Sequence, residues 1–525
     1  MEGVHLPTGR ERTGTPASLV VPATVVIVAS FVVRVVLIDR QSYWIDELFS
    51  VDESAGTVAH LLTAGSTEVH PPLYAALLQG WMWLGGPAGT HEVWTRLFST
   101  GCAVLAVVAT HRGLRPVRLG GEVRWALTTA TAAGGASIVY SQEARSYALL
   151  LAAAAGLTAA TVRAAVAEDG AGPRDRWRDR VAWTGWSLLA ATTHLFGAVL
   201  TAGAVTVLVG ARLQRTGSVR AVARTAAGRA ALGAAGCSLQ ALWLLAGIDR
   251  AGFAATTSWI PAPTPADLGT LLTSTFASGG LALHRDGFAW TSPVGAALAA
   301  VAVVAAVALL LAPRVPRRSR GDRADSADGA DVGRAAAVLL ALAAVVVVAA
   351  FLGSQDRHLW TLRNLLVVTP ALTWGVVCLA AAAAGSATGR RGVAAAVIGL
   401  LGIGLVPVAT DLARPYKTDF RGLVEQLAAV RAGRPGTAVA VIGTLPPATW
   451  RATGDARSGQ LYREMTPQEV ASPDAVARTA GPQVVVIYRR LLDPDLDGDV
   501  AALVTRLGPG CERVRLLGVG LVRCR

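Results

Sequence analysis

The stretch 335–352 reads AAAVLLALAAVVVVAAFL and decides the class of fold, because its eighteen residues are all apolar. A helix that crosses the hydrocarbon core of a bilayer needs about 20 mostly apolar residues. Similar runs cover 20–38, 365–384 and 393–410, and 53% of the 525 residues are hydrophobic while only 16% are charged. The sequence therefore predicts a mainly α, polytopic transmembrane helical bundle.

The apolar runs predict about eleven membrane spans. They lie at 17–38, 94–111, 125–140, 146–166, 182–193, 195–211, 230–248, 293–312, 335–352, 364–384 and 393–410. Arginines gather in alternate connections between these runs, which by the positive-inside rule predicts a cytoplasmic N-terminus. An odd number of spans then places the tail on the other side of a multi-pass cell-membrane protein.

This topology divides the chain into a cytoplasmic leader (1–16), a transmembrane domain (17–410) and an extracytoplasmic domain (411–525). The first outside loop is 39–92. On the cytoplasmic side, the charged segment 314–334 is expected to be a disordered linker.

The formal net charge of +13 does not indicate a nucleic-acid partner, because the basic residues cluster in short loops between apolar runs. Lys417 is the only lysine among 48 basic residues. We attribute this bias to genomic composition, so the choice of arginine over lysine at a given site says little about chemistry.

The tail has the pattern of a small α/β domain. TAVAVIG (437–443) and PQVVVIY (482–488) read as short buried strands, and a closing hairpin is expected around Gly518 and Gly520. Cys511 and Cys524 flank that hairpin, and an oxidising compartment would allow them to form a disulfide. A hairpin symmetric about Gly518 does not place them directly opposite, so the bond is expected to need a bulge or an offset.

The first outside loop carries two adjacent acids in QSYWIDELFS (41–50). The aromatic pair before them is typical of a membrane interface. Asp46 and Glu47 are candidate catalytic residues, since a desolvated carboxylate held near the membrane can take a proton from a hydroxyl. The alternative is a solvated pair of loop acids.

Three further groups lie at outside turns. His70 precedes two prolines and an amphipathic segment that is expected to lie along the interface, and the alternative is a plain helix start. Glu143 and Arg145 share a tight turn, where the alternative is an internal ion pair. His194 lies at the next outside turn. Glu47, Glu143 and His194 together form a candidate divalent metal site, against the alternative that the histidine is a structural hydrogen-bonding residue.

Arg357 and Arg363 lie at the outside entrance of the span at 364–384. A planar guanidinium suits a phosphate, because it can donate to two oxygens at once. The alternative is an orientation anchor that reaches to the interface.

Six motifs follow one another along the chain: YWIDELFS (43–50), HPPLYAALL (70–78), RLFSTGCAVLAV (96–107), SQEARSYALLL (141–151), THLFG (193–197) and RNLLVVTPAL (363–372). In this order and topology, the motifs resemble the polytopic glycosyltransferases of the C-type fold. The likeness is greatest to the family 39-like branch of protein O-mannosyltransferases and aminoarabinose transferases, and it covers roughly 30–385.

The resemblance implies that Asp46 is the catalytic base and that the donor is a sugar linked to a polyprenyl phosphate, a membrane lipid. It implies transfer to an acceptor hydroxyl with inversion, while Arg363, then Arg145 and Arg357, bind the donor phosphate. His70 and Glu143 would position donor or acceptor, and the acceptor itself stays open between protein, lipid and cell-wall glycan. The alternative function is a membrane transporter or lipid flippase, for which we find no internal repeat.

Overall fold

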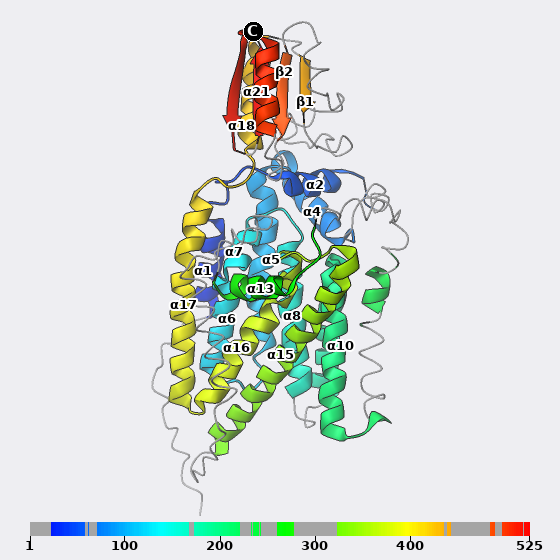
Figure 1. Ribbon diagram of the computed structural model, residues 1–525. Coiled ribbons are helices and arrows are strands. Elements are labelled where there is room, and N and C mark those ends of the chain that lie inside the picture. The colour runs from blue at the N-terminus through cyan, green and yellow to red at the C-terminus, as the bar shows by residue number, and fades with distance from the viewer. Residues whose placement is uncertain are drawn as a thin grey trace, which may run out of the picture.

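The computed structural model describes residues 23–57, 61, 71–166, 173–220, 233, 235–240, 242, 260–277, 323–434, 438–442, 483–488, 496–517 and 519–524. Over these residues the chain forms a helical bundle, a layer of short helices at one end of it, and a small sheet domain beyond that layer (Figure 1). The end of the bundle that carries the short helices is called the α2 end below.

The bundle is built from ten helices of the described chain. They are α1 (Ala23–Val35), α5 (Glu92–Gly113), α6 (Gly121–Ala133), α7 (Gly135–Ser141), α8 (Tyr147–Val166), α9 (Pro173–Thr193), α10 (Leu195–Thr216), α15 (Arg323–Arg357), α16 (Thr369–Ala384) and α17 (Ala387–Ala413). Within the described residues, six helical segments are long and apolar enough to cross a membrane. They cover Glu92–Gly113, Tyr147–Val166, Leu195–Thr216, Gly329–Arg357, Asn364–Ala384 and Ala387–Val406.

These helices confirm a polytopic bundle, while the count of eleven spans stays a prediction. The expected span at 293–312 lies outside the described residues, and the one at 230–248 lies mostly outside them. The expected span at 125–140 is broken at Gly134 into α6 and α7. The disordered linker expected at 314–334 is wrong in part, because α15 begins at Arg323. The apolar run 335–352 forms the same helix, and extension of an existing helix adds one hydrogen bond for each residue that joins it.

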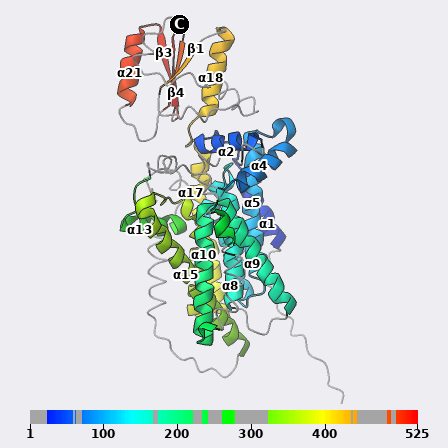
Figure 2. The same cartoon turned by 90° about the vertical axis from the view of Figure 1, so that its right-hand side faces the viewer.

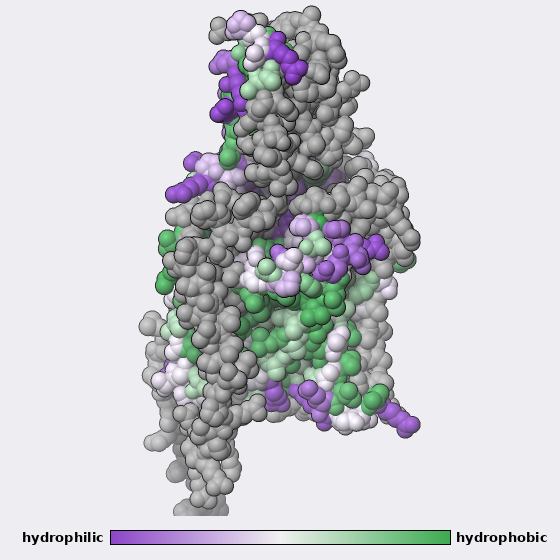
Figure 3. Space-filling model, viewed as in Figure 1, coloured by the Kyte–Doolittle hydropathy of each residue, from purple (hydrophilic) through white to green (hydrophobic). Residues whose placement is uncertain are grey.

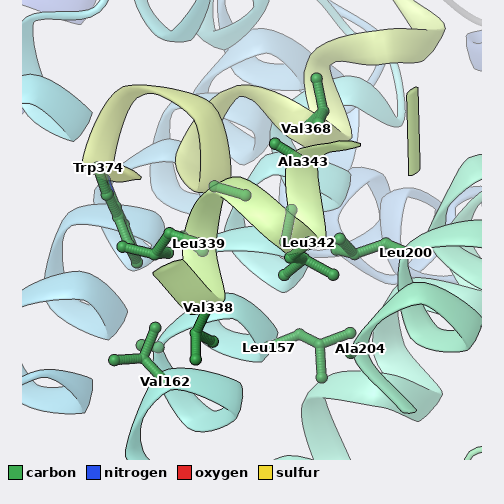
Figure 4. Close-up of a cluster of buried hydrophobic side chains, with 14 of the residues drawn as sticks. Leu157, Val162, Leu200, Ala204, Val338, Leu339, Leu342, Ala343, Val368 and Trp374 are labelled. Carbon is green, nitrogen blue, oxygen red and sulfur yellow. The ribbon is translucent and has the colours of Figure 1, made fainter. Parts of the chain in front are cut away.

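The bundle core is a close contact of α8, α10, α15 and α16 (Figure 4). Leu157, Leu200, Leu342 and Trp374 are fully buried in it. Nearly every residue of α8 is buried, and alanine is the commonest residue among them, which lets neighbouring helices approach closely. At Gly156 a Cβ atom would lie 2.2 Å from the Trp186 ring, so this approach of α9 requires glycine.

The outer face of the bundle is apolar. Figure 3 shows hydrophobic residues over the middle of the visible helices, with hydrophilic residues above and below them. Val28, Leu352 and Val406 are among the large apolar side chains exposed there. An exposed apolar surface of this extent fits contact with lipid.

The layer at the α2 end contains α2 (Ile45–Ala55), α4 (Leu73–Leu84), η2 (Gly86–Ala88) and η4 (Asn364–Val368), while α13 (Pro265–Ala277) lies across the bundle itself (Figure 1). In both views α2 lies between the bundle and the sheet domain (Figures 1 and 2). On α4, Trp81 stacks on Trp94 at 4.7 Å between ring centroids, while Trp83 is 80% exposed. This pattern fits the interfacial helix predicted after His70.

The tail confirms the predicted α/β domain. Its sheet has the order β1-β2-β4-β3, with helices α18 (Phe420–Gly433) and α21 (Leu496–Leu507) beside it. The strands are β1 (Ala438–Ile442), β2 (Gln483–Tyr488), β3 (Cys511–Leu516) and β4 (Val519–Cys524). The two strands predicted from sequence are the parallel pair β1 and β2, and β4 runs antiparallel to β2.

The closing hairpin corrects the expected register. Leu516 pairs with Val519, so the turn is centred half a residue earlier than Gly518. Cys511 therefore lies directly opposite Cys524, and the expected need for a bulge or an offset is wrong. Cys511 is disulfide-bonded, as predicted.

Candidate active site

The two acids of the opening motif lie in the first turn of α2, which follows Trp44. Acidic side chains are favoured there, because the N-terminus of a helix carries a partial positive charge. Successive helical residues are about 100° apart around the axis, so adjacent side chains face different directions. Asp46 keeps 21% of its side chain exposed, while Glu47 is fully buried.

Asp46 is paired with the arginine predicted to bind phosphate. Nη1 of Arg363 lies 2.9 Å from Oδ2 of Asp46, although 317 residues separate them in the chain. Arg363 immediately precedes η4, and its guanidinium also lies 5.7 Å from the centroid of the Trp44 ring. The fold thus brings the predicted base and the predicted phosphate ligand into direct contact.

Arg145 supports the same turn of α2. Its Nη1 donates to the backbone oxygen of Asp46 at 3.1 Å and to Oγ of Ser50 at 2.8 Å. The guanidinium is also 5.8 Å from the centroid of the Tyr147 ring. Arg145 therefore fixes the position of Asp46 through the main chain of α2, and it adds a second positive charge beside it.

Glu47 is held on both of its oxygens. Oε1 accepts from Nε of Arg96 at 2.8 Å and from the backbone N–H of Ala144 at 3.0 Å. Oε2 accepts from Nη2 of Arg96 at 3.0 Å and from Nζ of Lys417 at 2.9 Å. Burial disfavours the charged carboxylate, but Arg96 and Lys417 outweigh it and hold the pKa of Glu47 below its ordinary value. Glu47 is therefore an ionised anchor inside the protein.

Arg96 ties the loop before α2 to the bundle. It is fully buried near the start of α5. Its Nη1 donates to the backbone oxygens of Ile38 and Gln41, both at 2.9 Å, and its Nη2 donates to that of Ser42 at 3.1 Å. A guanidinium can satisfy a carboxylate and several carbonyls at once, because its five N–H groups form a rigid planar fork.

Glu143 contacts the site through Lys417. Nζ of Lys417 lies 3.0 Å from Oε1 of Glu143, and only 3% of the lysine side chain is exposed. The ammonium therefore lies between two buried carboxylates, those of Glu47 and Glu143. It is also 5.9 Å from the centroid of the Trp44 ring.

The third predicted metal ligand is His194, which precedes α10. His194 is buried at the start of α10, where its Nδ1 accepts from the backbone N–H of Phe196 at 3.1 Å. Burial lowers the pKa of His194 to about 3, and the nearby charges of Arg145 and Arg363 act in the same direction, so the ring is neutral. Its ring centroid is 6.0 Å from that of Tyr147.

Within the described ranges, no three His, Cys, Asp or Glu side chains are placed to hold a metal ion together. Between Glu47 and Glu143 the space is taken by the Lys417 ammonium. The arrangement of Glu47, Glu143 and Lys417 therefore does not fit a divalent cation between the two carboxylates. A metal requirement of the reaction stays a prediction.

One predicted residue, Arg357, does not join this group, and the position of another is not described. His70 lies outside the described residues. Arg357 is the last residue of α15 and is exposed, whereas only 16% of the Arg363 side chain is exposed. Of the two arginines predicted near this span, Arg363 is the one that contacts Asp46.

Sequence reasoning missed the residues that hold the site together. Arg96 carries a charge inside a predicted span, and charges at membrane depth are usually functional. Lys417 is the only lysine of the chain. Gln41 was missed as well: its Nε2 donates to the backbone oxygens of Leu412 at 3.1 Å and Arg414 at 2.9 Å.

Neither a protein-family model nor the sequence of a curated protein matches this chain. Among solved structures, the chain is similar to ArnT from Cupriavidus metallidurans in the apo state, with a TM-score of 0.53 and 14% sequence identity over 95% of this chain and 97% of that one. A second structure, ArnT from Cupriavidus metallidurans bound to undecaprenyl phosphate, has a TM-score of 0.42 and 16% identity over 95% and 97% of the two chains.

The likeness to the apo structure shows the fold. The chain is a multi-pass membrane protein with the polytopic helical architecture of the C-type glycosyltransferases, followed by a small sheet domain. At 14% identity, this likeness identifies the architecture and leaves the chemistry to the residues themselves.

Proposed function

We propose that the protein is a membrane glycosyltransferase that moves a sugar from a polyprenyl-phosphate donor to an acceptor hydroxyl on the extracytoplasmic face, with inversion. One observation carries this proposal. A partly exposed carboxylate, Asp46, and a guanidinium, Arg363, contact each other at 2.9 Å at the α2 end of a C-type bundle. A base and a phosphate ligand are the two groups that such a transfer requires.

In the proposed reaction, Asp46 takes the proton of the acceptor hydroxyl while the hydroxyl oxygen attacks the anomeric carbon. The bond between that carbon and the phosphate oxygen breaks, and its electron pair leaves with the lipid phosphate. Attack from the face opposite the leaving group inverts the configuration. Arg363 stabilises the charge that develops on the phosphate.

The ion pair between Asp46 and Arg363 also suggests how the donor prepares the site. Phosphate oxygens compete with the carboxylate for the guanidinium, because both are anionic acceptors. Donor binding would then release Asp46 to act as a base. Arg145 would hold the α2 turn in place during this exchange, since its bond to Asp46 is to the main chain.

The structure gives less support to the predicted positioning roles of Glu143 and His70. Glu143 is paired with Lys417 inside the protein, so we propose that it positions the site from within and does not contact the sugar. For His70 a role in positioning donor or acceptor stays a prediction. The acceptor class, the sugar and the side of the membrane stay predictions as well.

Purified full-length protein in lipid nanodiscs, incubated with a panel of polyprenyl-phosphate sugars, tests the proposal. We expect one donor to be consumed with release of the polyprenyl phosphate, and Asp46→Asn to abolish most of that consumption. Asp52→Asn is the matched control, because it is a partly buried acid on the same helix. In sealed liposomes that contain the protein, passage of the intact donor across the bilayer without consumption would instead support the transporter or flippase alternative.

A further inference from the structure

We propose that Lys417 is a positioning residue of this site, and that its ammonium does the work of the divalent metal ion that the sequence predicts there. This inference rests on the proposed function. It assigns part of the site to a segment that follows the last membrane helix. The segment 412–421 is called the tail linker below.

The first line of support is geometric. The Lys417 ammonium lies 2.9 Å from Glu47 and 3.0 Å from Glu143, and both carboxylates are fully buried. A compact ammonium can contact two carboxylates that converge on one point, whereas a guanidinium is broad and planar. The only lysine among the 48 basic residues lies at this point, where a compact ammonium fits between two carboxylates and a planar guanidinium fits less well. Composition alone does not explain its presence at this site.

The second line of support is charge balance. Four charged side chains of this cluster are only 0% to 3% exposed, those of Glu47, Glu143, Arg96 and Lys417. Together they carry two negative and two positive charges. Removal of Lys417 would take the cation from between two buried carboxylates, and a loss of charge balance inside the protein is strongly unfavourable. The ammonium therefore supplies the charge that a divalent metal would otherwise supply.

The third line of support is the docking of the tail linker on the loop that precedes α2. Gln41 donates to two backbone oxygens of the tail linker, and its Oε1 accepts from the backbone N–H of Tyr416 at 3.0 Å. The backbone N–H of Arg421 donates to Oγ of Ser42 at 3.0 Å.

Apolar packing continues this contact. Phe420 and Leu423 belong to the same buried cluster as Tyr43 and Leu48. These hydrogen bonds and apolar contacts fix the position of Lys417. Lys417 in turn fixes the position of Glu47, and so of the adjacent residue Asp46.

The test compares Lys417→Met, Lys417→Arg and the charge-balanced double variant Lys417→Met with Glu143→Gln, all in the full-length protein. Arg414→Met is the control, because Arg414 is an exposed cation three residues away in the tail linker. Donor consumption gives kcat and KM, and undecaprenyl phosphate serves as the binding probe in nanodiscs.

We expect Lys417→Met to lower kcat by about 100-fold with little change in donor KM, the scale at which misplacing a reacting group by about 1 Å acts. Lys417→Arg should restore the charge only in part, since its shape differs. The double variant should recover at least about 10-fold of the loss, because it also removes the negative charge of one of the two carboxylates that contact Lys417. The parent protein should be equally active in EDTA.

Parental kcat in Lys417→Met, or a double variant no better than the single one, would overturn the proposal. So would loss of activity in EDTA that a divalent cation restores. If Lys417→Met does not fold, the double variant decides alone, through its recovery of folded, active protein. If no donor is consumed by any variant, the proposed function fails. The inference then stands or falls on whether the double variant regains the thermal stability lost in Lys417→Met.

Discussion

Asp46 and Glu47 are neighbours in sequence with opposite surroundings. Asp46 is partly exposed and is paired with Arg363, which precedes a distant short helix. Glu47 is fully buried and is bonded to Arg96, Lys417 and the backbone of Ala144. In the proposed function, the two acids of one helical turn therefore have different roles: the partly exposed Asp46 is the group that a substrate would reach, and the buried Glu47 anchors the turn.

The difference shows how a membrane-rim site can be both accessible and rigid. A general base has to be reachable, so it can make few permanent bonds. Its position then has to come from its neighbours in the chain. Glu47 supplies that position with charge-assisted hydrogen bonds in a buried setting, where such bonds are strong.

The largest expected effect is on the free energy of unfolding, through the buried pair of Glu47 and Arg96. Arg96→Met should lower the free energy of unfolding by about 3–5 kcal/mol, since it leaves Glu47 buried with one cation fewer. Thermal or denaturant unfolding in detergent measures it. Arg96→Lys is the control: it keeps the charge but loses the planar fork, so an intermediate loss is expected. Parental stability in Arg96→Met would show that Glu47 is not an anchor.

The disulfide of the tail should matter for stability and not for transfer. Cys511→Ser should lower the stability of the tail domain by about 3 kcal/mol on the chain-entropy argument, because the bond closes a loop of roughly 15 residues. Turnover should be unchanged, since the disulfide lies at the end of the hairpin opposite Leu517, whose backbone oxygen accepts from the backbone N–H of Asp419 in the tail linker.

The same cysteine tests the topology. On intact cells, a membrane-impermeant maleimide should label the tail only after reduction, because disulfides persist outside the cytoplasm. Labelling that requires permeabilised cells would place the tail inside and contradict the odd number of spans.

On the exposed side, Arg363→Lys should raise the donor KM by about 10-fold although the charge is kept, because an ammonium cannot contact two phosphate oxygens as a fork does. Arg357→Lys is the matched control and should behave like the parent, since Arg357 is exposed and belongs to the end of α15. Unchanged kcat and KM in Arg363→Lys would place phosphate binding elsewhere.

A smaller effect is expected on acidification. The pKa of Glu47 is lower in the folded protein than its ordinary 4.5, so its contribution to stability is complete above pH 4.5. That contribution should decrease as the pH falls below 4.5, by at most about 1.4 kcal/mol per pH unit for one group. Unfolding curves between pH 6 and pH 3 measure it. Glu47→Gln should flatten the dependence, and an equally steep loss in that variant would assign it to other carboxyls.

Much of the architecture could be predicted from the sequence, because apolar runs and strand patterns are local signals. The helix predicted at 335–352 lies within α15, and the strand predicted at 482–488 corresponds to β2. The half-residue error in the hairpin had a large consequence, since register depends on which residues form the turn.

The site was predictable only in part. The resemblance assigned Asp46 and Arg363 to the same reaction, and the structure brings their side chains into contact across 317 residues. Sequence alone gave Asp46 and Glu47 the same surroundings, because it does not show which face of a helical turn is buried. The sequence assigns no role to Lys417, because the excess of arginine over lysine is attributed to composition. Its role depends on where the tail linker docks, which is a tertiary contact with no local pattern.

The division of labour between the two acids is tested most directly by measuring turnover and thermal unfolding of Asp46→Asn and Glu47→Gln side by side. Asp46→Asn should lose at least ~100-fold in turnover, the usual contribution of a general base, with the parental unfolding midpoint. Glu47→Gln should unfold at a clearly lower temperature and lose less turnover. If Glu47→Gln instead lost the larger share of turnover while keeping its stability, Glu47 would be the reacting group and the account would be contradicted.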